Sequence, residues 1–144
     1  MQRIYVFHEV DPRISDELIV RAAQTVFSGE EIEGSGSVSL VFVNDARLHA
    51  MNVQFLQHDY PTDVISFTLD ESDEEAWGEI YISVDRAAEQ AEAYRVTLQN
   101  ELIRLVIHGA LHLSGYDDTE PKDYEVMKEK EELYLSRIIQ KEAL

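Results

Sequence analysis

The chain has 144 residues, 44% of them hydrophobic, so its length suits one compact domain with its own core and its composition argues against disorder. It contains no cysteine, which excludes disulfide bonds and thiolate metal sites; imidazole and carboxylate groups would have to hold any transition metal. The formal net charge of −17 argues against non-specific attraction to nucleic acid, and no binding of DNA is expected.

The beginning of the chain shows no sign of a signal peptide, and no apolar run approaches the roughly 20 residues that cross a bilayer. A cytoplasmic protein that is not embedded in a membrane is therefore expected.

Strand and helix patterns alternate along the first part of the chain. β-Branched and aromatic residues predict strands at 2–8 and 37–43, and the second run is apolar enough to lie inside a sheet. Between them, Ser15 is placed to cap a helix over 16–27.

A second helix is predicted over 45–58, because Asn44 can cap its start and Pro61 would stop it. The apolar face of this helix is expected to consist of Leu48, Met51 and Phe55.

Two more strands are predicted at 62–69 and 78–84, paired antiparallel across the acidic run 70–75, which is expected to be a solvated loop. The alternation in the first of these strands places Val64, Ser66 and Thr68 on one side and Ile65, Phe67 and Leu69 on the other.

Three helical patterns complete the chain, over 85–95, over 98–113 and from Pro121 onward. The second is apolar on nearly all sides, which predicts a central, buried helix. In the last helix the residues expected to face inward are Tyr124, Met127, Leu133 and Ile138. The order β, α, β, α, β, β, α, α, α predicts one α+β domain over 1–144, with a small mixed four-stranded sheet packed with about five helices.

A candidate metal site lies on the predicted central helix. His108 and His112 are four residues apart, so both imidazoles project from one face and can bind one divalent ion; the alternative is a pair of core histidines with satisfied hydrogen bonds. Gly109 favours the metal, because glycine costs ~1 kcal/mol inside a helix and marks a close approach. After the helix, Asp117 or Asp118 could return to the same face as a third ligand.

The segment His108-Gly-Ala-Leu-His112-Leu-Ser-Gly-Tyr-Asp-Asp118 resembles the HGxLHLxGYDH signature of the bacterial YbeY-type endoribonucleases, the rRNA maturation factors, at ten of eleven positions. Asn52, the run PTDVISF at 61–67 and the run GEI at 78–80 resemble further landmarks of that family in order and spacing.

The resemblance implies a metal-dependent, single-strand-specific endoribonuclease acting in 16S rRNA 3′-end maturation and ribosome quality control, with RNA and the small ribosomal subunit as partners. It implies one bound zinc ion, with His108, His112 and Asp118 at the ligand positions. The family positions beside the site, candidates for lining the substrate cleft, are Asp63, Ser66 and Glu79.

Asp118 stands where the family has a third histidine. A carboxylate binds zinc at ~2.0–2.2 Å, but two histidines and one carboxylate also suit iron(II) or manganese, so zinc is not the only metal expected. The alternative role for Asp118 is a solvated capping residue.

Leu56 stands where the family has an arginine, and leucine cannot stabilise charge on a scissile phosphate. Arg104, one turn before His108, is a candidate to replace that arginine; the alternative is an ion pair with Glu101.

The predicted mechanism is hydrolysis of an RNA phosphodiester by metal-activated water, with no general base identified. A metalloprotease is disfavoured, because Gly109 occupies the position of the catalytic glutamate in HExxH. A non-catalytic ribosome-assembly factor with a structural metal stays open, and the net charge and Leu56 favour it.

Overall fold

The elements follow one another in the predicted order. The computed structural model describes residues 2–34, 36–57, 62–69, 76–117 and 119–143, with side chains of the last helix up to Ile139. The strands of this part of the chain are β1 (Arg3–His8), β2 (Ser37–Val43), β3 (Val64–Thr68) and β4 (Ala76–Ser83). Its helices are α1 (Asp16–Gly29), α2 (Asp45–Leu56), α3 (Val84–Tyr94), α4 (Leu98–Leu113) and α5 (Pro121–Ala143).

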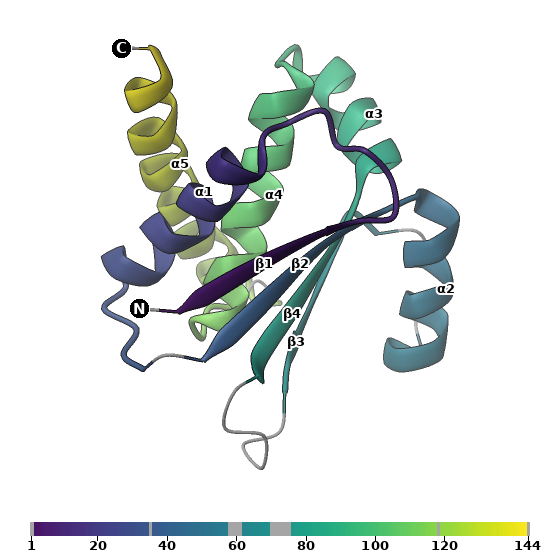
Figure 1. Cartoon of the computed structure of the whole chain (residues 1–144), viewed down its shortest axis with the longest axis horizontal. Coiled ribbons are helices and arrows are strands. Elements are labelled where there is room, and N and C mark those ends of the chain that lie inside the picture. Colours follow the sequence, from purple (N-terminus) through teal and green to yellow (C-terminus); the bar gives the residue numbers. More distant parts are fainter. Residues whose placement is uncertain (1, 35, 58–61, 70–75, 118, 144) are drawn as a thin grey trace.

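The four strands form one mixed sheet in the order β1-β2-β4-β3 (Figure 1). β2 pairs in parallel with both β1 and β4, whereas β3 pairs antiparallel with β4, as predicted. The helices α1 and α2 follow β1 and β2, and both begin at the predicted caps: Ser15 accepts a hydrogen bond from the Leu18 amide and Asn44 accepts one from the Arg47 amide.

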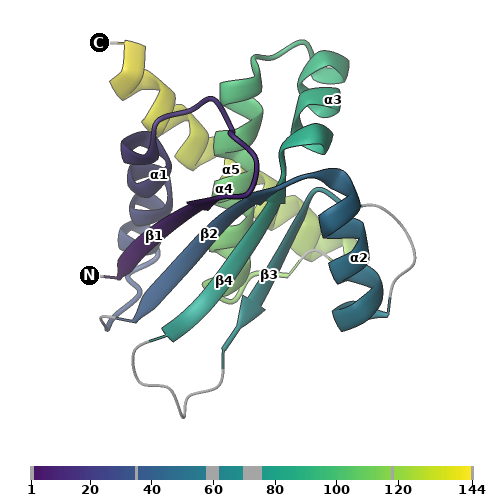
Figure 2. The same ribbon diagram turned by 45° about the vertical axis from the view of Figure 1, so that its right-hand side comes forward.

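Helices cover both faces of the sheet. α1, α4 and α5 lie on one face and α2 lies on the other (Figures 1 and 2). Alternation along β2 therefore supplies two cores, with Leu40 and Phe42 in the larger one and Val41 and Val43 in the smaller one beneath α2. Burial on both faces explains why 37–43 reads as a continuous apolar run.

The helix α4 is central, as predicted, and Gly109 allows it to lie directly on the sheet. A Cβ atom at position 109 would lie 2.5 Å from Ile80 Cγ2 and 3.2 Å from Ser66 Oγ. Ser66 Oγ donates a hydrogen bond of 3.2 Å to the Gly109 carbonyl oxygen. The close approach inferred from Gly109 is thus between α4 and strands β3 and β4.

Gly109→Ala is expected to lower the free energy of unfolding by about 1–3 kcal/mol, because the new methyl group overpacks the contact with Ile80. Helix propensity alone predicts the opposite, a gain of about 1 kcal/mol. Urea unfolding measures the difference, with Gln99→Ala on the exposed side of α4 as a control for propensity. A stabilised Gly109→Ala variant would contradict the packing argument.

Two predictions about α2 were wrong. The helix ends at Leu56 and not at 58, because Gln57 adopts the left-handed conformation with φ 58°. Phe55, expected in the apolar face with Leu48 and Met51, is 56% exposed and makes an edge contact with Phe67, ring centroids 5.8 Å apart. Pro61, expected to stop the helix, lies outside the described residues.

Two inward residues of α5 were also misassigned. Tyr124 and Leu133 are exposed, whereas Met127 and Ile138 are buried as expected. The buried stripe runs through positions 127, 131, 134 and 138 and therefore includes Glu131 and Tyr134. The prediction selected apolar residues and missed a buried carboxylate in the same stripe. Among the described helices, none is both long and apolar enough to span a membrane.

Candidate metal centre

The two histidines of α4 point their Nε2 atoms at one another. His108 Nε2 lies 3.1 Å from His112 Nε2, and the ring centroids are 4.7 Å apart. Two nitrogen ligands of one tetrahedral zinc ion, each at ~2.0–2.1 Å from it, are about 3.3 Å apart. The spacing of the pair therefore fits two ligands of a single ion.

The other ring nitrogens determine which tautomers the histidines adopt. His112 Nδ1 lies 3.0 Å from the Tyr116 carbonyl oxygen, which can only accept, so Nδ1 carries the proton and Nε2 is an acceptor. His108 Nδ1 lies 3.2 Å from Glu131 Oε1 and donates to that carboxylate in the same way. Two acceptor nitrogens facing each other at 3.1 Å are compatible when a cation lies between them, so the residues present fit a divalent metal ion.

Glu131 belongs to a charged network that lies largely below the surface. Arg104 donates to Glu101 through Nε at 2.8 Å and also through Nη2, and its Nη1 donates to Glu131 at 3.0 Å. The side chain of Glu101 is only 1% exposed. Hydrogen bonding to Glu101 raises the pKa of Arg104, so the guanidinium stays charged.

Of the two roles left open for Arg104, the structure contains the ion pair with Glu101. Its Nε, Nη1 and Nη2 atoms donate to protein carboxylates, and 28% of the side chain stays exposed. A role of Arg104 in place of the family arginine that Leu56 replaces stays a prediction. Arg104 lies one turn before His108 and donates to Glu131, the carboxylate that His108 also contacts.

The three candidate cleft residues lie in different places. Asp63 accepts a hydrogen bond of 3.2 Å from Gln90 and lies 3.9 Å from Arg104, so it joins the charged network. Ser66 faces α4, as its bond to Gly109 shows. Glu79 is not brought to the histidines: it alternates with Ile80, which packs against α4, and accepts a hydrogen bond from Tyr81 on the α2 face.

The segment after α4 contained both candidates for a third ligand. Asp118 lies outside the described residues. Asp117 accepts hydrogen bonds from the amide and hydroxyl groups of Thr119 at 3.3 and 3.1 Å. Within the described ranges, no group of three histidine, cysteine or acidic side chains is placed to hold an ion.

Comparison with known proteins assigns the chain to a family. The family model described as Endoribonuclease YbeY matches residues 6–139. The chain belongs to the YbeY family. Proteins named Endoribonuclease YbeY from Chlorobaculum parvum and Pelotomaculum thermopropionicum are 38% and 41% identical to it over 135 and 128 residues, 94% and 84% of each chain. A solution structure of a Thermotoga maritima protein is similar with a TM-score of 0.66 and 31% identity, covering 96% of this chain and 90% of the other.

Glu30, a carboxylate outside the YbeY signature, holds the C-terminal end of α4 in place through Tyr116. Tyr116, whose carbonyl oxygen faces His112, donates its hydroxyl to Glu30 at 2.5 Å. The same carboxylate accepts bonds from Tyr134 and from Lys130, the latter at 3.2 Å. Burial raises the pKa of Glu30, but these donated bonds more than offset it and the pKa is lowered.

Sequence reasoning missed Glu30, which follows the end of α1, and Glu131 on α5, because carboxylates are usually solvated. The signal that could have found Glu131 is its spacing from Met127 and Ile138 on one helical face. No comparable signal marks Glu30, whose partners lie 86 to 104 positions away in the sequence.

Glu30→Gln is expected to cost about 1–3 kcal/mol of unfolding free energy at pH 7, because Tyr116, Lys130 and the buried Tyr134 lose a charged acceptor whose side chain is only 10% exposed. The folded-state pKa is below the ordinary value of 4.5, so this contribution is present above pH 4.5 and is lost as the pH falls through the lowered pKa. Urea unfolding at pH 7 and near pH 3 should therefore show a shrinking difference from wild type. Exposed Glu33→Gln is the control; a gap for Glu30→Gln that is equal at both pH values would contradict the assignment.

Proposed function

We propose that this protein is a metal-dependent endoribonuclease that cleaves single-stranded RNA. Relatives over nearly the whole chain are named endoribonucleases, and the observation in this chain that carries the proposal is the convergence of the two Nε2 atoms at 3.1 Å. One divalent ion is held by His108 and His112, with Asp118 as the proposed third ligand. Zinc is the first candidate, and iron(II) or manganese suits the same donor set.

The residues around the pair prepare it for this role. A divalent ion in such a site supplies Lewis-acid chemistry for phosphodiester hydrolysis. Glu131 and the Tyr116 carbonyl hold protons on the Nδ1 atoms and so keep both Nε2 atoms available as ligands. Arg104 donates to Glu131 and so holds it in place. Leu56 stands where the family has an arginine, so no cation at that position contacts the phosphate.

The cellular role follows the family. We propose action in the cytoplasm on 16S rRNA, at 3′-end maturation and in ribosome quality control, in contact with the small ribosomal subunit. Co-sedimentation of the full chain with isolated small subunits tests that contact.

The test of the activity compares cleavage of a fluorescent single-stranded RNA by wild type and by His112→Ala after metal repletion. The expected result is loss of cleavage in the variant, with retention in His8→Ala, a histidine on the opposite edge strand that contacts Asp16. Equal cleavage by wild type and His112→Ala would refute the hydrolase. A wild type that binds metal and subunits but cleaves no RNA would support the non-catalytic assembly factor, which the net charge of −17 favours.

A further inference from the structure

Each histidine of the pair borders a hollow of the surface. A cavity of about 450 Å³ between α3, α4 and α5 is bordered by His108, and a groove of about 290 Å³ over β3 is bordered by His112. Since the two rings are 4.7 Å apart, the histidine pair borders both hollows. A nucleic-acid strand that crosses the pair would therefore place one nucleotide on each side of it.

The larger hollow, named here the tyrosine cavity, carries two aromatic rings that are open to solvent. Tyr94 on α3 is 61% exposed and Tyr124 on α5 is 52% exposed, whereas Tyr134 on α5 is buried. Exposed rings beside a cavity of this size are typical of small-molecule sites. They offer flat apolar faces to an aromatic ligand.

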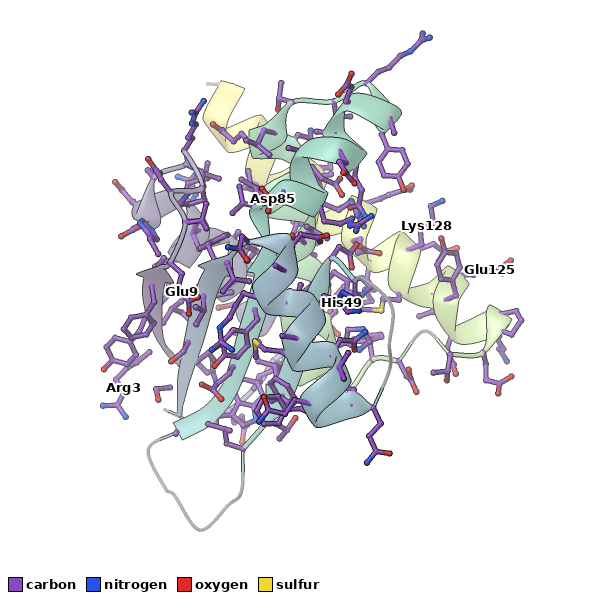
Figure 3. All side chains as sticks on the ribbon, turned by 90° about the vertical axis from the view of Figure 1, so that its right-hand side faces the viewer. Arg3, Glu9, His49, Asp85, Glu125 and Lys128 are labelled. Atoms are coloured by element: carbon purple, nitrogen blue, oxygen red, sulfur yellow. The ribbon has the colours of Figure 1, made fainter. Side chains whose placement is uncertain are left out.

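The charges of the tyrosine cavity favour a base over a phosphate. Its acidic side chains are Asp63, Glu131 and Glu132, against the cations Arg104 and Lys128, the latter on α5 (Figure 3). Arg104 is already bonded to carboxylates. A phosphate would therefore meet an excess of negative charge, while a neutral base brings N–H groups that carboxylates accept.

The geometry points to the tyrosine cavity as a subsite for one unpaired base of the RNA substrate, next to the nucleotide whose phosphate lies at the histidine pair. This inference rests on the proposed function. Stacking of a base on Tyr94 and Tyr124 supplies affinity that needs no attraction to phosphates, and so reconciles RNA binding with a net charge of −17. The groove over β3, with Leu56 and Val64 on its wall, receives the nucleotide on the other side.

The experiment measures the Kd of the full chain, as purified, for a fluorescent single-stranded RNA whose phosphorothioate linkages resist hydrolysis. Tyr94→Ala and Tyr124→Ala are each expected to weaken binding about 5- to 150-fold, the range for losing one base–aromatic stack, while Tyr124→Phe stays close to wild type. Tyr5→Ala is the matched control, because Tyr5 is 48% exposed on the opposite edge strand β1. Circular dichroism checks that the variants fold.

A second arm replaces single nucleotides of the RNA by abasic ones. One abasic position should weaken wild-type binding more than it weakens binding by the Tyr124→Ala variant, because in that variant the base has already lost one of its two stacking partners. Tyrosine variants that bind like Tyr5→Ala, or a Tyr124→Phe variant as weak as Tyr124→Ala, would overturn the subsite. Cleavage of ordinary RNA is measured separately: tyrosine-dependent binding without cleavage refutes only the nuclease, and cleavage without tyrosine dependence refutes only the subsite.

Discussion

His112→Ala is expected to bind zinc more than about 100-fold more weakly than wild type, because it removes one of the two nitrogens that converge at 3.1 Å. Loss of an outer partner of a ligand costs 10- to 100-fold in metal affinity, and loss of the ligand itself should exceed that range. Metal analysis after repletion, with competition by a chromophoric chelator, measures the change. Chelation should also lower the melting temperature of wild type, since the ion binds only the folded chain.

Glu131→Gln shows how much of the zinc affinity depends on the carboxylate that orients His108. An amide can still accept from His108 Nδ1 but carries no charge, so zinc affinity is expected to fall by at most about 10- to 100-fold, less than in His112→Ala. His8→Ala should bind like wild type. A His112→Ala variant with wild-type affinity would show that the two histidines form a core hydrogen bond and bind no metal. Equal losses in both variants would contradict the assignment of His112 as a metal ligand and of Glu131 as a residue that only orients His108.

The histidine pair was predictable because its determinants are local. Two residues four apart on one helix share a face whatever the rest of the fold does. The glycine between them was interpreted in favour of the metal, whereas the group that approaches it in the structure is the sheet, through Ile80 and Ser66. The order of the nine elements in the described chain was likewise confirmed, since hydrophobic period and caps are properties of short segments.

The surroundings of the pair were not predictable in the same way. Glu131 reaches both His108 and Arg104 from α5, 23 and 27 positions further along the chain, so these contacts depend on how α5 packs on α4. Patterns of hydrophobicity place charged residues outside by default. The assignment of α5 therefore placed Leu133 inside and overlooked Glu131, and Glu79 was grouped with Ser66 although they point to opposite faces of the sheet.

Arg104→Met is expected to lower the free energy of unfolding by about 3 kcal/mol, the lower end of the range for breaking a buried ion pair. The lower end applies because 28% of the Arg104 side chain is exposed, although Glu101 is only 1% exposed and cannot recover its hydration. Urea unfolding in the presence of a chelator measures the network without a contribution from metal. The double variant Arg104→Met with Glu101→Gln should recover part of the loss, because no charge is then left buried at position 101.

Arg86→Met is the matched control for this experiment. The side chain of Arg86 is also 28% exposed, but its partner Asp45 is 33% exposed, so the pair at 3.0 Å stays in contact with water. Its loss should cost no more than about 1 kcal/mol. Similar losses at the two arginines would mean that burial of the partner carboxylate does not set the cost. A larger loss at Arg104 that Glu101→Gln partly reverses would show that Arg104 compensates the buried charge of Glu101. The same arginine bonds Glu131, the carboxylate that orients His108.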